Sequence, residues 1–168
     1  IFEHPRKVIV NGQYIDKYTH YFIEDSDFDS YEIIDRPYLR KHYNKPSKNR
    51  SYIEKISFAP MYFVQYFKVS NLFLNKKEKK LINNIETELN LLFDVNFNFK
   101  NLILNIIKKF KAKYLYYNKL LKKRNPKKVF LVVSYGLEAL ISACNDNNIP
   151  TIELQHGTIS KYHLGYSF

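Results

Sequence analysis

Short apolar runs separated by polar turns make up the first 50 residues of the chain. A strand is predicted over residues 7–10, closed by an Asn-Gly turn, and a second over residues 31–37 (YEIIDRP), where a proline ends it. Between them, residues 14–25 carry apolar side chains three and four positions apart, which indicates a short helix. The polar and basic residues 40–50 are predicted to form a loop.

From residue 60 onwards the hydrophobic pattern takes on a helical period. Pro60 suits the first position of a helix, and the residues that follow it are apolar enough to be buried. Residues 76–93 show a clearer amphipathic pattern, with charged side chains on one side and an apolar stripe on the other. The stripe consists of Leu81, Ile85, Leu89 and Leu92.

Residues 99–123 are predicted to form the longest helix of the chain. Apolar and aromatic side chains recur along it at spacings of three and four, and we assign this stripe to the core. It consists of Ile103, Ile106, Phe110, Tyr114, Tyr117 and Leu121. The dipeptide Asn125-Pro126 ends the helix.

A strand-helix-strand pattern follows this proline. Residues 127–136 (KKVFLVVSYG) form an apolar, β-branched run, residues 137–148 have the composition of a short helix, and residues 149–157 (IPTIELQHG) form a second apolar run. This order predicts a βαβ unit, whose two strands are parallel and covered on both faces. We therefore expect an α/β fold with an additional helical segment over residues 60–124.

The composition of the chain indicates a protein with a sizeable core. Of its 168 residues, 45% are hydrophobic and 17% aromatic, which excludes a disordered chain, and this length fits one domain. The single cysteine, Cys144, excludes an internal disulfide and a thiolate metal cluster and favours a reducing compartment. No apolar run is long enough to span a bilayer, and the first residues do not form a signal peptide.

The net charge of +11 is distributed unevenly along the chain. Between Asp94 and Glu138 there is no carboxylate side chain, whereas lysines recur throughout that stretch. Such asymmetry attracts an anionic partner: nucleotide phosphates, an anionic membrane surface, nucleic acid or an acidic polymer. A basic helix face that is simply solvated has the same composition, so charge alone leaves these alternatives open.

The ends of the two strands in the predicted βαβ unit are candidates for ligand binding, because open parallel sheets bind ligands at the carboxyl ends of their strands. The first end carries Ser134, Tyr135 and Gly136, with Glu138 in the first turn of the next helix. The backbone amides there can face an anion or a sugar hydroxyl. The alternative is a plain turn whose Glu complements the helix dipole.

The second strand end is the sequence Gln155-His156-Gly157-Thr158. Gly157 permits a positive φ angle and a close backbone approach, and His156 is expected at the rim of the sheet. A neutral imidazole there can accept a proton at about pH 7. Glu153, three residues upstream, can orient that imidazole or bind a hydroxyl. The alternative is a loop histidine that only bonds the backbone.

The segment VVSYGLEALISACNDNNIPTIELQHGTISKYHLGYSF, residues 132–168, resembles part of the GT-B type glycosyltransferases that build bacterial capsule and lipopolysaccharide. Its His-Gly-Thr core is also similar to a motif of the CDP-glycerol glycerophosphotransferases, whose histidine is taken as the base that deprotonates the acceptor hydroxyl. By motif position that histidine is His156. That family usually has an aromatic before the histidine and a proline soon after the threonine. This chain has Gln155 and Ile159 instead, which favours glycosyl transfer.

The resemblance implies that residues 1–168 are one Rossmann-like, acceptor-side domain, with residues 60–124 as a helical insertion. The chain is then expected to be a fragment of a longer enzyme, whose second domain binds the nucleotide-sugar donor. The acceptor is a glycan or lipid-linked precursor, and no metal or other cofactor is implied. Tyr162 and His163 are placed near the cleft with His156. We expect a cytoplasmic enzyme whose basic helix rests on the anionic inner face of the cytoplasmic membrane.

Two acidic patterns near residue 25 are rejected as metal sites. Asp25-Ser26-Asp27 has the Asp-x-Asp form that GT-A glycosyltransferases use for a divalent metal, but it lies in an early polar loop. The longer DSDFDS starts like a calcium loop, but it lacks the sixth-position glycine and has Arg36 where a Glu is needed. Two alternatives to glycosyl transfer stay open: polyol-phosphate transfer, and a nucleic-acid-binding module, for which RNP, KH and zinc-finger signatures are lacking.

Overall fold

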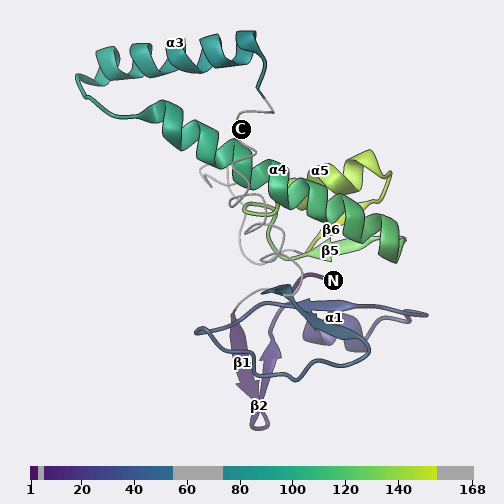
Figure 1. Cartoon of the computed structure of the whole chain (residues 1–168). Helices are drawn as coiled ribbons and strands as arrows, with labels where there is room; N and C mark the ends of the chain where they lie inside the picture. Colours follow the sequence, from purple (N-terminus) through teal and green to yellow (C-terminus); the bar gives the residue numbers. More distant parts are fainter. Residues whose placement is uncertain (4–5, 55–73, 155–168) are drawn as a thin grey trace.

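The computed structural model describes residues 1–3, 6–54 and 74–154. Its elements follow one another as short strands, two long helices and a strand-helix-strand unit (Figure 1). They are β1 (Lys7–Val10), β2 (Gln13–Asp16), α1 (His20–Glu24), β3 (Ile33–Asp35), β4 (Arg50–Tyr52), α3 (Lys76–Phe93), α4 (Phe99–Arg124), β5 (Val129–Leu131), α5 (Glu138–Asp146) and β6 (Thr151–Glu153). The helix predicted from Pro60 lies outside the described residues.

Two pairs of parallel strands are linked through the N-terminal segment. β3 pairs with β4 and β5 pairs with β6, both parallel. Phe2 forms parallel bridges to Ile34 on one side and to Leu131 on the other, so it lies between the two pairs. The order across them is therefore β4, β3, Phe2, β5, β6. This mixture of parallel strands and helices confirms the predicted α/β class.

The predicted βαβ unit is present as β5, α5 and β6, with Val129 opposite Thr151 in the register. α4 and α5 pack together over one face of β5, where Leu131, Leu140 and Tyr117 are almost fully buried. Phe130 points to the other face, because successive side chains of a strand alternate. The centroid of its ring lies 5.0 Å from that of the Phe22 ring. The second face is covered only in part, because Ile152 of β6, opposite Phe130 in the register, is 36% exposed.

The N-terminal hairpin confirms one prediction and corrects another. β1 and β2 are antiparallel around a tight turn in which Asn11 and Gly12 both have positive φ, as an Asn-Gly hairpin needs. The helix predicted over residues 14–25 is wrong at its start, because residues 13–16 pair with β1 instead. Only the five residues of α1 are helical there. The predicted loop at 40–50 also ends one residue early, since Arg50 begins β4.

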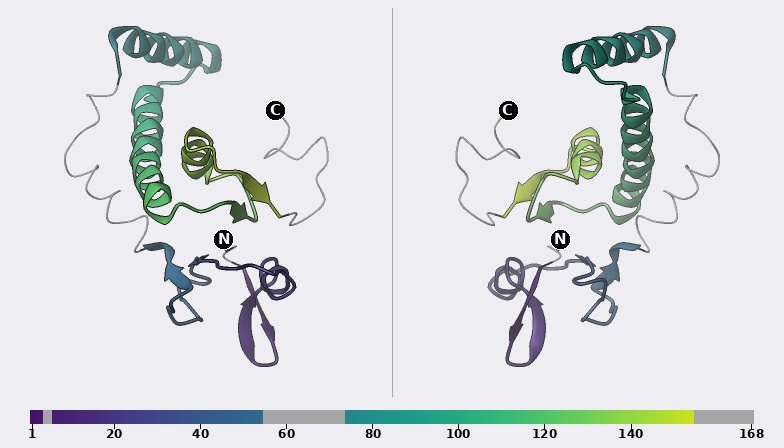
Figure 2. Two further views of the ribbon diagram at one scale, coloured as in Figure 1. Left: turned by 90° about the vertical axis from the view of Figure 1, so that its right-hand side faces the viewer. Right: turned by 90° about the vertical axis from the view of Figure 1, so that its left-hand side faces the viewer.

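The two long helices have nearly the predicted bounds but not the predicted burial. Asn75 begins α3 with a capping box, and Asn125 ends α4 in the left-handed conformation. In the predicted apolar stripe of α3, Leu81 and Leu92 are exposed and Ile85 and Leu89 half-buried, and the buried residue of this helix is instead Ile82. Ile106 of α4 is also exposed, because the first half of α4 and all of α3 stand away from the strands (Figure 2). No helix of the described residues is long and apolar enough to cross a membrane.

Candidate functional site at the carboxyl ends of the strands

Ionisable side chains gather where the parallel strands end. Glu3 directly follows Phe2, Asp35 is the last residue of β3, and Glu54 comes two residues after β4. Because these strands run in the same direction, their carboxyl ends meet at one edge. Ser134 and Leu154 follow β5 and β6 at that same edge. This is the edge at which open parallel sheets bind ligands.

Lys7 is the centre of a buried ionic cluster at this edge. Its ammonium donates a hydrogen bond to Glu3, lies 3.2 Å from Asp35 Oδ1 and lies 3.9 Å from Asp16 Oδ2. Its side chain is only 1% exposed. Since charges away from water are stable only when paired, the first residue of β1 is held tightly against the strand ends. The base of the β1–β2 hairpin is thereby fixed at the candidate site.

Arg50 and His42 extend the cluster towards the surface. Arg50 Nη1 donates to Glu3 Oε2 at 2.9 Å. The His42 ring bridges two carboxylates, with Nδ1 3.1 Å from Asp35 and Nε2 2.8 Å from Glu54. Since both ring nitrogens face carboxylate oxygens, both contacts are hydrogen bonds only when the ring is doubly protonated. The ring also stacks on Tyr52, at 3.7 Å between centroids.

The cluster shifts the pKa values of two of its carboxyls in opposite directions. Burial raises the pKa of Glu3, although Lys7 and Arg50 oppose that rise. Burial would also raise the pKa of Asp35, but a hydrogen bond with Glu3, the charge of Lys7 and the contact with His42 lower it instead. Of the two carboxyls, Asp35 is therefore the stronger acid. The half-buried rim of the cluster, His42 and Arg50, can donate hydrogen bonds to an oxygen-rich ligand.

The turn after β5 is ordered by its own hydrogen bonds. Gly136 has a φ of +83°, and its N–H donates to Glu138 Oε1 at 2.7 Å, while the Leu137 N–H donates to the Ser134 carbonyl at 3.0 Å. The Glu138 carboxylate therefore already occupies one amide at the start of α5. Tyr135 is 49% exposed beside it. This geometry matches the alternative of a turn whose Glu complements the helix dipole, and the binding of an acceptor hydroxyl by Ser134, Tyr135 and Gly136 stays a prediction.

The second predicted strand end is described only as far as Leu154. Glu153 is half-buried on β6, and the Leu154 N–H donates to the Leu131 carbonyl at 2.7 Å. The remaining candidates lie outside the described residues. They are Gln155, His156, Gly157, Thr158, Tyr162 and His163. Their proposed roles stay predictions.

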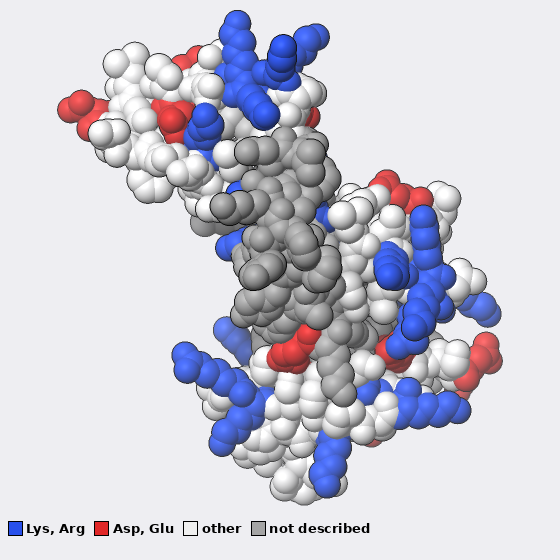
Figure 3. All heavy atoms as spheres, in the orientation of Figure 1, with Lys and Arg blue, Asp and Glu red and all other residues white. Residues whose placement is uncertain are grey.

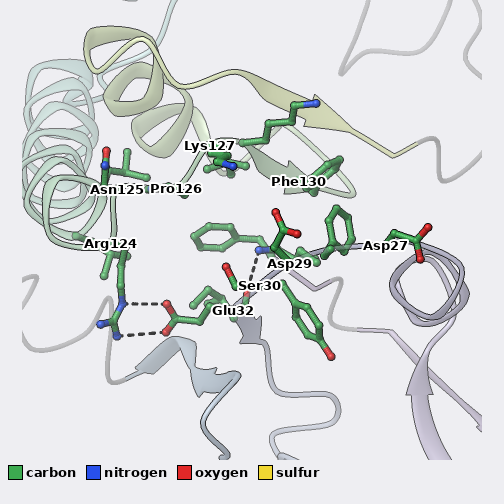
Figure 4. A pocket seen from close by; sticks show the side chains of 18 residues that line it. Asp27, Asp29, Ser30, Glu32, Arg124, Asn125, Pro126, Lys127 and Phe130 are labelled. Carbon is green, nitrogen blue, oxygen red and sulfur yellow. Dashed lines mark hydrogen bonds and ion pairs between the residues drawn. The ribbon is translucent and has the colours of Figure 1, made fainter.

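A separate pocket of about 570 Å³ lies at the opposite, amino-terminal edge of the strands (Figure 4). Residues just before β3 and β5 line it, and a bidentate pair between Glu32 and Arg124 closes one side, at 2.9 and 3.3 Å. Asp27, part of the rejected Asp-x-Asp pattern, also lines it. In the described part of the chain, no three His, Cys, Asp or Glu side chains are grouped as metal ligands.

Sequence reasoning missed the ionic cluster. Asp35 lies inside the predicted strand over residues 31–37, two residues before the proline, and the structure ends the strand at Asp35 instead. Lys7, His42 and Arg50 carried none, because lysine, histidine and arginine side chains, at the start of a strand or in a polar loop, usually face solvent. Only the approach of distant segments makes them neighbours.

Comparisons of the chain with models of protein families, with curated proteins and with solved structures give no match.

Proposed function

We propose that this chain is the acceptor-side domain of a GT-B type glycosyltransferase, which moves a sugar from a nucleotide-sugar donor to a capsule or lipopolysaccharide glycan. The observation that carries the proposal is the order of the parallel segments. Along the chain, Phe2 is the first parallel segment, β3 the second, β4 the third, β5 the fourth and β6 the fifth. Side by side in space, they follow the order third, second, first, fourth, fifth. This order matches that of doubly wound Rossmann folds, which supports the proposal.

The same order locates the expected cleft. In doubly wound sheets the ligand binds outside the carboxyl ends of the strands, where the order reverses, and here the reversal lies between Phe2 and β5. Glu3 follows Phe2 at this point, and the turn from Ser134 to Glu138 follows β5. The turn after β5 carries polar groups suited to sugar hydroxyls, whereas Glu3 is only 3% exposed and already pairs with Lys7 and Arg50. The histidine of the His-Gly-Thr motif follows β6, the next strand along.

In the proposed reaction His156 acts as the general base. It takes the proton of an acceptor hydroxyl while that oxygen attacks the anomeric carbon of the donor sugar. The bond from this carbon to the nucleotide diphosphate breaks, and the diphosphate leaves with the bonding electron pair. Such base catalysis contributes roughly 10²–10⁴-fold in rate. Ser134, Tyr135 and Glu138 are the proposed contacts of the acceptor, and the reaction takes place on the cytoplasmic side.

The test is the substitution His156→Ala in an enzyme that carries both domains. Transfer from a sugar nucleotide is expected to fall by at least about a hundredfold, with an unchanged circular dichroism spectrum. His20→Ala is the matched control, because His20 lies on α1 and pairs with Glu24 at the surface. Turnover close to normal in His156→Ala would remove this residue from the mechanism. Release of CMP from CDP-glycerol, without sugar transfer, would assign the polyol-phosphate reaction instead.

A further inference from the structure

We propose that the helical arm of this protein, residues 75–111, docks on the surface of an anionic lipid bilayer. The arm comprises α3, the connection after it and the first half of α4. This surface is separate from the strand-end site, and the proposal goes beyond glycosyl transfer. Its test measures binding to lipid and needs no activity, so it can fail or succeed independently of the proposed reaction.

The arm is an overhang whose side chains are mostly exposed or half-buried, with Ile82 as the buried residue of α3. α4 has 26 residues and is therefore about 39 Å long. Its buried residues, Ala112, Tyr117 and Leu121, all lie in its second half. α4 ends beside the amino-terminal edge of the strands and precedes β5, so its first half projects past their carboxyl ends (Figures 1 and 2). The arm thus extends on the side where the acceptor is expected.

Large apolar side chains are exposed along this overhang. Leu91 is 83% exposed, Leu92 74% and Phe93 62%, at the end of α3. The other exposed apolar residues of the arm are Leu81, Val95, Phe97, Leu102, Ile106 and Phe110. A concentration of this kind is unusual on a surface that faces only water, and it marks an interaction site.

The tip of the arm is held in a defined shape. The Asn90 amide makes two hydrogen bonds with the backbone of Phe97, at 3.0 and 2.9 Å. Glu86 Oε2 accepts the N–H of Lys100 at 2.6 Å, and Asp94 ends α3 in the left-handed conformation. These bonds fix the connection between the helices. The apolar side chains of residues 91–97 are therefore presented without a large cost in ordering the chain.

The charge of the arm selects an anionic membrane as the partner. The part of α4 that belongs to the arm carries four lysines, Lys100, Lys108, Lys109 and Lys111, and no carboxylate side chain. Further lysines gather at the N-terminal end of α3 (Figure 3). The four acidic residues of the arm are Glu78, Glu86, Glu88 and Asp94, and the first two already accept backbone N–H groups. A helix that combines exposed apolar residues with lysines lies in the interface of an anionic bilayer.

Other partners fit this surface less well. A second copy of the chain would bring together two molecules that each carry a net charge of +11. Single-stranded nucleic acid matches the lysines, but Leu and Ile side chains do not stack on bases as aromatic rings do. A bilayer accommodates both features, because its headgroups attract the lysines and its hydrocarbon takes up the leucines.

The experiment is co-sedimentation of the full chain with lipid vesicles. Vesicles of phosphatidylcholine are compared with vesicles that contain about 30% phosphatidylglycerol. We expect binding to the second kind only, and weakening as NaCl rises from about 0.05 to about 0.5 M. Phe93→Ser should weaken binding about tenfold, since the side chain no longer enters the bilayer. Lys100→Gln and Lys109→Gln should each weaken it about fivefold.

The matched controls lie at the far end of the molecule. Ile9 is 62% exposed, as is Phe93, but it belongs to the β1–β2 hairpin, and Lys45 is an exposed lysine of the loop before β4. Ile9→Ser and Lys45→Gln should leave vesicle binding unchanged. The proposal is overturned if the folded chain binds no vesicles, if Ile9→Ser weakens binding as much as Phe93→Ser, or if the arm variants bind normally. Tight, salt-dependent binding of an RNA oligonucleotide that Phe93→Ser does not affect, without vesicle binding, would assign the surface to nucleic acid.

Discussion

The ammonium group of Lys7 lies 3.2 Å from the carboxylate of Asp35, and both side chains are only 1% exposed. Lys7 begins the N-terminal hairpin, whereas Asp35 ends a strand of the parallel pair beside it. The ion pair therefore joins two structural units. It also lies at the edge where the candidate site is located, so the same residues that hold the hairpin in place shape one wall of that edge.

Loss of the central cation should destabilise the protein strongly. Lys7→Met leaves Glu3, Asp16 and Asp35 buried beside one another with only Arg50 and His42 to compensate them. Removing one partner of a buried ion pair typically costs about 3–5 kcal/mol in the free energy of unfolding. Urea denaturation followed by circular dichroism measures this loss. Lys45→Met, in an exposed loop, serves as the control and should change stability by less than about 0.5 kcal/mol. A loss below about 1 kcal/mol for Lys7→Met would contradict the burial of the cluster.

The two shifted carboxyls should respond to pH in opposite ways. The pKa of Asp35 is lowered, so this group stabilises the fold above its ordinary pKa of 3.8, and the contribution is lost as the pH falls through its folded pKa. Asp35→Asn should therefore be most destabilising at neutral pH and approach the wild type in acid.

The pKa of Glu3 is raised above 4.5, so its contribution is present below that value and is lost as the pH rises. The deficit of Glu3→Gln relative to the wild type should thus shrink as the pH rises. Denaturation midpoints measured from acid to neutral pH test both trends. Parallel curves for the two variants would refute the opposite pKa shifts of Asp35 and Glu3.

Glu138 at the start of α5, a predicted contact of the acceptor, should also contribute to the stability of the fold. Glu138 accepts the Gly136 N–H and lies in the first turn of the helix, where a negative charge opposes the helix dipole favourably. Glu138→Ala should lower the free energy of unfolding by about 1 kcal/mol, and Glu138→Gln, which keeps an acceptor oxygen, by about half as much. Thermal denaturation of the two variants separates the contribution of the hydrogen bond to stability from the contribution of the charge. Equal losses in both would assign the effect to the charge alone.

Several local features were predictable from the sequence because they rest on neighbouring residues. The Asn-Gly turn needs two residues that tolerate positive φ, and Asn11 and Gly12 supply them. α3 and α4 begin and end close to the predicted positions, because their caps, Asn75 and Asn125, are adjacent to the periodic runs. The parallel pairing of β5 with β6 followed from the helix between them, since a crossover of that kind joins strands of the same direction.

Burial and the ionic cluster were decided by tertiary structure. A hydrophobic stripe indicates which side of a helix is apolar, but not whether another element covers that side. Tyr117 is buried against α5 and the strands, whereas Ile106 of the same stripe lies beyond them and is exposed. In the same way, Phe2 becomes the segment between two strand pairs only because Ile34 and Leu131 approach it from distant parts of the chain. Lys7, Asp35 and Arg50 become one charged group for that reason. Periodicity and caps act over a few residues, so the sequence by itself determined the long helices, the Asn-Gly turn and the βαβ unit. Contacts between distant segments decided the pairing of β2 and β4, which surfaces are buried and which charges meet.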